Sequence, residues 1–242
     1  MNKDEIILNI KEDVENELGE ILEENEIGIS YYDYDNGVES FYCFPEYCSL
    51  DRLKSKIFIG KSISEKGLTN EFVANMLQEV FKKDFVDAFC TLNSILIFSN
   101  EEELNAALEF AAPDEIEEVL SYDEHTIDSF EKHNVCGKMW YRKQSPMIYE
   151  KSILNVAIDI ANKYANEKED KEYYNQILNE EYSCGIIQTI IHECRHCMLE
   201  TNLFLSEEKY PTYLNSENEV EEFCCSAYEM LSAKYKMLPY RV

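Results

Sequence analysis

Apolar residues recur every three or four positions along much of this chain, which is the period of a helix that buries one face. The first such stretch, residues 3–25, carries acidic residues between its apolar positions. We expect it to form a helix packed on the domain, with a solvated acidic face, rather than a partner-binding helix. The same period predicts helices over residues 68–86, 101–111, 113–120, 150–166, 182–200 and 217–236. Pro113 suits the first turn of its helix, where no backbone N–H is needed.

Shorter apolar runs between these helices predict strands. Two segments rich in aromatic residues, 28–35 and 38–44, flank Asn36-Gly37, a dipeptide that favours a tight turn between antiparallel strands. Further strands are predicted over residues 55–59 and 92–98. The segment 137–148 suggests one more strand, which ends at Pro146. The mixture of helices and strands predicts an α+β fold.

Polar residues gather over 121–135, and this change of composition suggests a domain boundary. We divide the chain into a mixed α/β N-terminal region, residues 1–125, and a second domain, residues 126–242. The sequence contains no glycine-rich phosphate-binding loop, internal repeat or Ser/Gly/Pro-rich linker. The first region therefore offers no motif to which chemistry can be assigned, and its role is left open.

The charge balance narrows the range of partners. The formal net charge is −27, and Lys and Arg form no cluster of the kind that binds a nucleic-acid backbone or an anionic membrane. We expect no nucleic-acid and no membrane partner, whereas a basic protein partner is compatible with the charge. An acidic inhibitor that mimics DNA has the same charge signature and stays as a rival interpretation.

Cysteine usage and the start of the sequence indicate the compartment. The nine cysteines are odd in number and include the adjacent pair Cys224-Cys225, unlike the disulfide framework of a small secreted protein. The first residues lack the apolar core of a secretory signal, and no apolar run has the length needed to cross a bilayer. We expect a cytoplasmic protein with mostly free thiols.

One short segment carries recognisable chemistry. His192-Glu193-Cys194-Arg195-His196 is an H-E-x-x-H sequence inside a predicted helix. Residues four apart share a helix face, so His192 and His196 can direct both imidazoles to one metal ion. Two imidazoles and a carboxylate, with one position left to water, suit catalytic zinc. Glu193 lies one residue further round, where it can take the proton of that water.

The alternative is an amphipathic helix whose two histidines face solvent. The residues around the motif are mostly apolar, which is typical of a helix buried in a domain core. A buried pair of histidines needs polar partners, and a metal ion supplies one. The flanking sequence therefore favours a metal site.

A third zinc ligand is expected among four glutamates between residues 215 and 225. Ser216 and Glu219 match a capping box, which predicts that the last helix begins at Ser216 and gives Glu219 a local structural role. The apolar stripe of that helix comprises Val220, Phe223, Cys224, Ala227, Met230 and Leu231. Glu217 lies nearer this stripe than Glu219 or Glu221, and Glu222 points away. Glu217 is our first candidate for the ligand. Glu221 can hydrogen-bond the other nitrogen of a ligand histidine, and both Glu219 and Glu221 stay as alternative ligands.

The two motifs together resemble those of the gluzincin metallopeptidases. These proteins carry H-E-x-x-H and a glutamate ligand on the next helix, often in the pattern E-x-x-A-D-x-F-A. The matching residues are Glu217, Val220, Glu221, Phe223 and Cys224, with Val, Glu and Cys in place of the usual Ala, Asp and small residue. Arg195 places a charge where the stricter motif has an uncharged residue. The resemblance covers about residues 135–236 and implies a zincin-like domain: a small mixed sheet, a helix behind it, the motif helix and the ligand-glutamate helix.

The resemblance also implies the role of each site residue. His192, His196 and Glu217 would hold Zn²⁺, and Glu193 would pass a proton from water to the leaving amine. A peptide substrate could pair its backbone with an edge of the sheet, for which 137–144 is the candidate strand. A Tyr or His that stabilises the oxyanion is expected as well. The candidates are Tyr210, Tyr213, Tyr228, His125 and His133, among which the sequence does not choose.

Cys194 and Cys197 could act as soft zinc ligands or as a redox pair. Because they lie three residues apart within the motif helix, we expect both to pack as small apolar groups. We interpret Cys184, Cys224 and Cys225 in the same way.

The sequence thus predicts a zinc-dependent metallopeptidase that hydrolyses a peptide or protein substrate, with Glu193 as general base. The alternative is a non-catalytic protein, either an inactive zincin-like relative or an acidic interaction protein that binds a basic partner.

Overall fold

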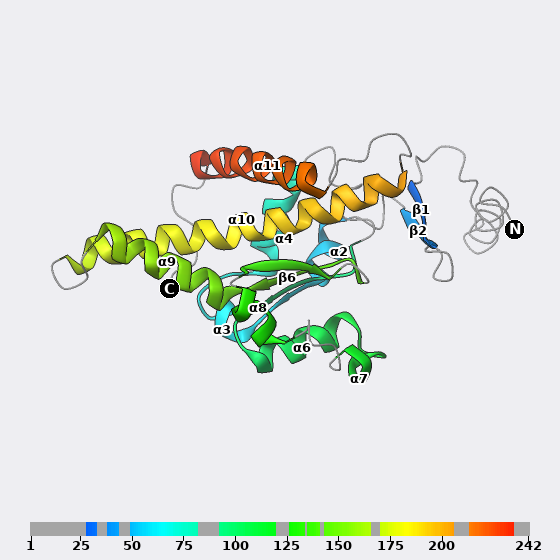
Figure 1. Cartoon of the computed structure of the whole chain (residues 1–242), viewed down its shortest axis with the longest axis horizontal. Helices are drawn as coiled ribbons and strands as arrows, with labels where there is room; N and C mark the ends of the chain where they lie inside the picture. The colour runs from blue at the N-terminus through cyan, green and yellow to red at the C-terminus, as the bar shows by residue number, and fades with distance from the viewer. Residues whose placement is uncertain are drawn as a thin grey trace, which may run out of the picture.

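The computed structural model of the chain describes residues 28–32, 38–43, 49–81, 92–119, 126–133, 135–140, 143–165, 170–205 and 213–234 (Figure 1). Within these ranges, the side chains of residues 28–32, 38–43, 118, 198–205, 213–217, 228 and 232–234 lie outside the description.

Four strands, which come from three of the short apolar runs, form one mixed sheet. β4 (Ile95–Phe98) lies between β3 (Ile57–Ile59) and β6 (Ser145–Tyr149) and runs parallel to both. β5 (Gly137–Trp140) pairs antiparallel with β6, with Met139 opposite Pro146, and forms one edge of the sheet. An edge strand of this kind can accept an additional extended chain.

Both faces of the sheet are buried. Successive side chains of a strand point to opposite sides of the sheet, so each strand contributes to two cores. In β4, Ile95 and Ile97 join one apolar core, whereas Leu96 and Phe98 join a second core on the other face. The first core is covered by α2 (Leu50–Ser55), α3 (Lys61–Ser64), α4 (Asn70–Phe81), α9 (Glu150–Tyr164), α10 (Lys171–Leu205) and α11 (Tyr213–Lys234). The second is covered by α6 (Glu101–Ala111), α7 (Ile116–Val119) and α8 (Ile127–His133). Figure 1 shows the resulting layers, with α11 over α10, α10 over the sheet, and α6 to α8 on the opposite face.

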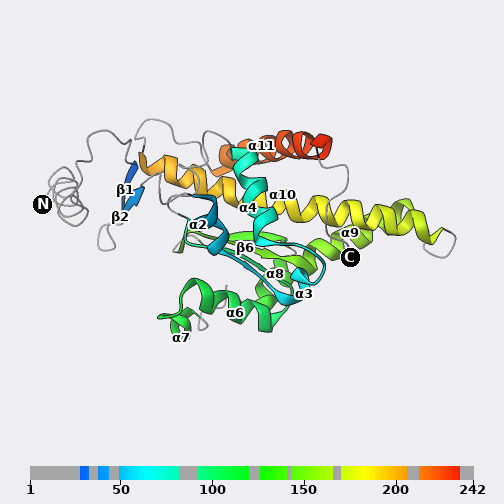
Figure 2. The same ribbon diagram turned by 180° about the vertical axis from the view of Figure 1, so that it is seen from behind.

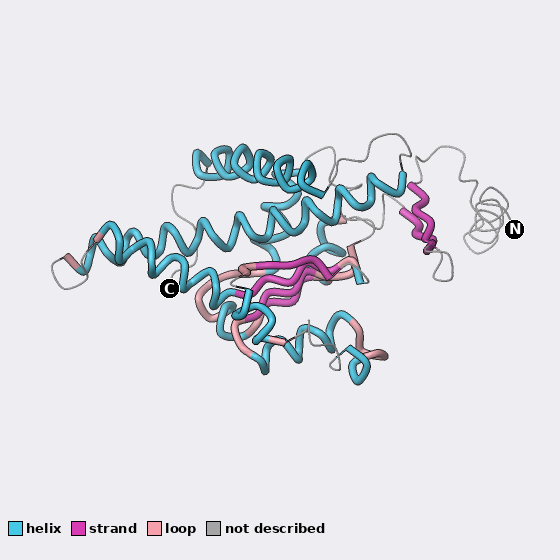
Figure 3. The backbone as a smooth tube through the Cα atoms, viewed as in Figure 1, coloured by secondary structure: helices cyan, strands magenta, loops and turns pink. Residues whose placement is uncertain are grey.

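The two long helices α9 and α10 lie side by side as a helical hairpin that carries the chain back across the sheet (Figure 3). Gly185 lets them approach closely, since a Cβ atom at that position would lie 2.6 Å from Cγ2 of Ile153. The buried face of α9 includes Ile153, Ala157 and Ala161, as its period predicts. Val156 and Tyr164 also lie in this helix but are exposed by 39% and 63%.

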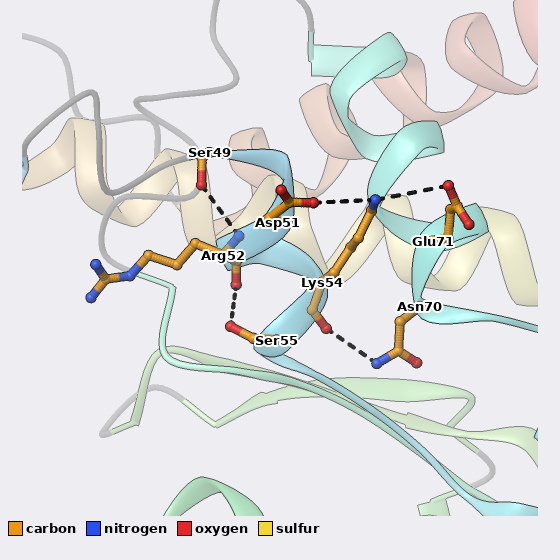
Figure 4. Close-up of polar contacts among 7 residues, drawn as sticks. All are labelled: Ser49, Asp51, Arg52, Lys54, Ser55, Asn70 and Glu71. Carbon is orange, nitrogen blue, oxygen red and sulfur yellow. Dashed lines mark hydrogen bonds and ion pairs between the residues drawn. The ribbon is translucent and has the colours of Figure 1, made fainter.

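A small polar network ties α2 to the start of α4 (Figure 4). The hydroxyl of Ser49 caps α2 by accepting a hydrogen bond from a backbone N–H of its first turn. Nζ of Lys54 lies 3.4 Å from Oδ1 of Asp51 and 3.8 Å from Oε1 of Glu71. The side chain of Asn70 donates a hydrogen bond of 3.1 Å to the carbonyl oxygen of Lys54. Seen from behind, α2 lies above the sheet, whereas α4 crosses in front of α10 and extends to the level of α11 (Figure 2), where Phe81 packs against Phe223.

Much of the predicted secondary structure is confirmed. The hairpin predicted over 28–44 is present as the antiparallel pair β1 (Gly28–Tyr32) and β2 (Val38–Cys43), with its turn outside the described residues. The strands predicted at 55–59 and 92–98 appear as β3 and β4, and the helices predicted at 101–111 and 150–166 as α6 and α9. The helix predicted over 68–86 appears as α4, while residues 82–91 and the predicted helix 3–25 lie outside the description.

The segment 137–148 forms two strands, and the prediction of one strand ending at Pro146 is wrong. The chain reverses between Trp140 and Ser145, and Pro146 becomes the second residue of β6. Gln144 adopts a left-handed φ of 46° in this reversal. The sequence there carries no Gly or Asn turn signal, so the reversal could be recognised only from the pairing of the strands.

Three helix starts also differ from the prediction. The motif helix begins at Lys171 rather than near residue 182. α7 begins at Ile116, after a turn that contains Pro113. The last helix begins at Tyr213, three residues before Ser216, so Ser216 lies inside α11 and is not its N-cap.

The α+β class is confirmed, with helices surrounding one small mixed sheet. Strands β3 and β4 precede residue 125, whereas β5 and β6 follow it, so the predicted division after residue 125 falls within one sheet. Leu77 of α4 and Ile190 of α10 are buried in the same core cluster. Over the described ranges, no helix combines the length and apolarity that crossing a bilayer requires.

Candidate metal centre

The two histidines of the motif converge on one point beside α10. Their Nε2 atoms lie 3.1 Å apart, and the ring planes meet at 73° with centroids 4.7 Å apart. His196 is buried and His192 half-buried. The pairing follows from the helix, because four residues make about one turn and place both rings on the same face.

The spacing of the two nitrogens fits a shared zinc ion. Two nitrogens bound at 2.0–2.1 Å to one tetrahedral zinc lie about 3.3 Å apart, close to the 3.1 Å of His192 and His196. Without metal, the same distance is a hydrogen bond in which one ring donates its proton to the other. The donor pair therefore suits zinc with little rearrangement.

Glu193 projects from the motif helix toward the edge strand. The residue is only 6% exposed. Its Cγ and Oε1 atoms pack so closely on Gly137 that a Cβ atom at position 137 would lie only 2.9 Å from each of them. Cys136 lies just before β5, and the pKa of its thiol is raised. The main cause is burial, and the negative charge of Glu193 adds to it. The carboxylate thus lies between α10 and the start of the edge strand.

A pocket of about 400 Å³ opens where β5, α10 and α11 meet. Its lining contains His192 and Glu193 together with Glu221 of α11. The other lining residues are Val135, Cys136, Gly137, Gln188, Thr189, Cys224 and Cys225. One histidine of the pair, the buried carboxylate and the edge strand therefore face a common space.

Sequence reasoning missed Gln188 and Thr189 as pocket residues. A signal for them existed, since each precedes a motif residue by four positions and therefore shares its helix face: Gln188 with His192, and Thr189 with Glu193. Cys136 and Gly137 had no local signal, because their place depends on how the edge strand packs against α10.

The glutamates of α11 separate into distinct roles. Glu219 forms an ion pair with Arg195 of the motif helix, which replaces the capping role predicted for it. Glu221 is exposed and lines the pocket, and Glu222 is exposed outside the pocket lining. Glu217 lies in α11, but its side chain is outside the description. Among the side chains that are described, no three His, Cys, Asp or Glu residues gather to hold one ion.

The apolar stripe predicted for α11 is confirmed. Val220, Cys224, Ala227 and Leu231 are buried, and Phe223 packs against the same core. Met230 lies beside them and is also packed on this core. The stripe packs α11 against the apolar core that also contains residues of the motif helix.

The cysteines of the motif helix pack as predicted. Cys194 and Cys197 are fully buried in the apolar core, and the six described cysteines are all free thiols. Burial, followed by the charges of Cys225 and Glu193, raises the pKa of Cys224 to about 12. Cys225 is exposed, so its predicted packing as an apolar group is wrong.

The oxyanion-stabilising residue stays a prediction. His133 is exposed at the end of α8 and is absent from the pocket lining. His125 and Tyr210 lie outside the described residues, as do the side chains of Tyr213 and Tyr228.

Fold and site together define a mixed α+β protein that presents an H-E-x-x-H helix to the edge strand of its sheet. Comparison with family models, curated proteins and solved structures gives no match. The functional argument therefore depends on the chemistry of the site alone.

Proposed function

We propose that this protein is a zinc-dependent metallopeptidase of the cytoplasm. The observation that carries the proposal is the convergence of the His192 and His196 Nε2 atoms, 3.1 Å apart, beside a pocket that Glu193 also lines. Glu217 of the next helix is the proposed third ligand. The six described cysteines are free thiols, which supports a reducing compartment.

We also propose that the part of the chain from residue 126 onward is zincin-like. The order of its elements supports this: two strands of a mixed sheet, then α9, the motif helix α10 and the glutamate-bearing helix α11. The N-terminal region would then complete the sheet with β3 and β4. This gives the described residues between 49 and 119 a structural part in the same domain.

The chemistry divides between the ion and the chain. When bound, zinc supplies a Lewis acid that lowers the pKa of a water molecule and polarises a carbonyl group. The Glu193 carboxylate accepts the proton of the attacking water and delivers it to the leaving amine nitrogen. Its burial and its packing against Gly137 hold it in one position for both transfers.

The edge strand orients the substrate. β5 lies at the rim of the sheet, and Gly137 lines the pocket. An extended peptide that adds to this edge by main-chain hydrogen bonds would bring a backbone carbonyl past the face of the motif helix that carries Glu193. Peptide bonds are therefore the substrate class that the geometry supports best.

The net charge of −27 favours a second candidate, a non-catalytic protein that binds a basic partner, with or without a zinc site. Such a protein would form a salt-sensitive complex with a basic protein, and chelation of metal would not affect that complex if it carries no zinc.

Metal analysis combined with a peptide-hydrolysis screen tests the proposal. The purified protein should contain about one zinc per chain, and His192→Ala with His196→Ala should remove it. Glu193→Gln should keep the zinc and lose hydrolysis, because the amide cannot accept the proton. Stoichiometric zinc without hydrolysis of any peptide would indicate an inactive relative. Absence of zinc, with no effect of the histidine substitutions, would reject the metal centre altogether.

A further inference from the structure

Arg195 stands inside the motif, between Glu193 and His196, and reaches across to α11. Its Nη2 atom forms an ion pair with Oε1 of Glu219. Its guanidinium carbon lies 4.5 Å from the centroid of the Phe223 ring. The arginine side chain is only 13% exposed, whereas its partner Glu219 is 42% exposed, so the ion pair is partly shielded from water on the arginine side.

We propose that Arg195 is a positioning residue for the metal centre, which holds α11 at the register that brings the third ligand to the two histidines. The inference rests on the proposed zinc function. Arg195 itself touches neither metal nor substrate in this role and acts through α11.

The two partners of Arg195 lie one helical turn apart on α11, so the arginine contacts this helix at two points along its axis. Glu219 and Phe223 are four residues apart and share one side of α11. A planar guanidinium can donate to a carboxylate in its own plane while stacking its face on an aromatic ring. Together the two contacts restrict both the position of α11 along its axis and its rotation.

The apolar packing between the helices does not select a register as sharply. Val220 and Cys224 are buried against the core beside the motif helix, but apolar contacts are non-directional and tolerate a small slide. The ion pair with Glu219 is directional and hydrogen-bonded. Arg195 therefore fixes the position of α11 along α10 more precisely than the apolar stripe does.

The register matters because metal ligation is exacting. Glu217 precedes Glu219 by two residues in the same helix, a rise of about 3 Å along its axis. Any slide of α11 past α10 therefore moves the backbone of Glu217 relative to His192 and His196. Ligand distances must lie within about 0.2 Å of their usual values, so a slide that leaves the fold intact still weakens zinc binding.

Zinc affinity of the purified full-length chain, measured by competition with a chromophoric chelator at 25 °C, tests the inference. Arg195→Met should weaken zinc binding about 10- to 100-fold, the range known for residues that orient metal ligands. Arg195→Lys should recover part of the loss, because it keeps the charge but not the planar stack. Glu219→Gln should also weaken binding. The control Arg52→Met, at an exposed arginine of α2, should leave the affinity unchanged.

A second control separates positioning from general loss of stability. Ile153→Ala empties a contact between α9 and α10 and should lower the midpoint of urea unfolding without changing the zinc affinity of the folded protein. If affinity merely followed stability, Ile153→Ala would weaken zinc binding as Arg195→Met does, and that result would overturn the inference.

Wild-type zinc affinity in both Arg195→Lys and Glu219→Gln would overturn it as well. Glu219 is 42% exposed, so its variant provides a test even where Arg195→Met fails to fold. If the wild-type chain binds no zinc, the proposed function and the positioning role fall together. If it binds zinc and the variants bind equally well, only the positioning role falls.

Discussion

Gly137 of the edge strand lies directly against Glu193 of the motif helix. A Cβ atom at position 137 would stand 2.9 Å from both Cγ and Oε1 of Glu193, and 2.7 Å from Cγ2 of Thr189. Strand and helix therefore approach as closely as the absence of a side chain permits. This contact holds the proposed general base between α10 and the strand to which we expect a substrate to bind.

Gly137→Ala should accordingly displace either the carboxylate or the strand. Inserting one methyl group into such a contact costs about 1–3 kcal/mol of the free energy of unfolding. We expect peptide hydrolysis to fall more than tenfold while zinc stays bound, measured as kcat alongside zinc content.

Gly185→Ala is the matched control, because it creates a comparable clash of 2.6 Å with Ile153 in the α9–α10 interface. It should lower stability with a smaller effect on kcat. Equal loss of kcat in both variants would argue against a special role of the 137–193 contact.

A second prediction concerns a buried carboxylate at the start of α9. Glu150 is 1% exposed and accepts hydrogen bonds from Nζ of Lys66 at 2.6 Å and from the hydroxyl of Tyr182 at 2.7 Å. Glu150→Ala should lower the free energy of unfolding by about 3 kcal/mol, because it leaves the partly buried ammonium of Lys66 without this partner. Tyr182→Phe should cost about 1–2 kcal/mol. Urea denaturation measures both, and a loss below about 0.5 kcal/mol for Glu150→Ala would contradict the assignment.

A third prediction uses the adjacent thiols of α11. Cys225 is exposed, whereas Cys224 is buried and its pKa is raised to about 12. Iodoacetamide at pH 8 should therefore alkylate Cys225 well before Cys224 in the native protein, as mass spectrometry of the digested protein can show. Equal labelling of the two at pH 8 would mean that α11 is not packed as described.

The same raised pKa has a consequence for stability. The unfolded thiol ionises near pH 8.5, whereas the folded Cys224 keeps its proton to about pH 12. Between these values the folded state binds more protons, so its contribution to stability falls as pH rises. Stability of the wild type should drop more steeply above pH 8.5 than that of Cys224→Ala, measured as urea midpoints over a pH series.

A fourth prediction follows from zinc binding to the folded state alone. At a free zinc concentration one hundred times Kd, the ion should stabilise the protein by about 2.7 kcal/mol, or roughly 5–10 °C in Tm for a chain of this size. The shift should vanish with a chelator and in the His192→Ala, His196→Ala double variant. A zinc-dependent shift that persists in the double variant would place the ion elsewhere.

The last prediction concerns the charge of the pocket. Among the residues that the structure describes, the lining includes two carboxylates, Glu193 and Glu221, and no Lys or Arg. Peptides with a basic residue near the scissile bond should be hydrolysed faster than acidic ones, and the preference should weaken in Glu221→Gln. Glu222→Gln, at the neighbouring exposed position outside the pocket lining, should leave the ratio of kcat/KM values unchanged. An equal change in both variants would assign the preference to the overall charge of the protein.

The local pattern of the sequence predicted the elements that bury a continuous stripe. The apolar period of α9, the run of β4 and the stripe of α11 were recognisable because helix and strand place side chains at fixed intervals. His192, Glu193 and His196 were recognisable for the same reason, since their spacing within one helix already fixes their relative positions. The one-turn relationship of the imidazoles needs no tertiary information.

The tertiary structure decided what joins segments distant in the sequence. The reversal between β5 and β6 carries no turn signal, and the place of Gly137 beneath Glu193 depends on the packing of the edge strand. Glu219 matched a capping box in sequence but pairs with Arg195, because α11 begins at Tyr213 and lies alongside the motif helix. Residue spacing determines geometry only within an element. Contacts between elements depend on which apolar faces are buried against each other. The residues of two such faces are distant in the sequence, and the local apolar pattern does not show which faces will pair.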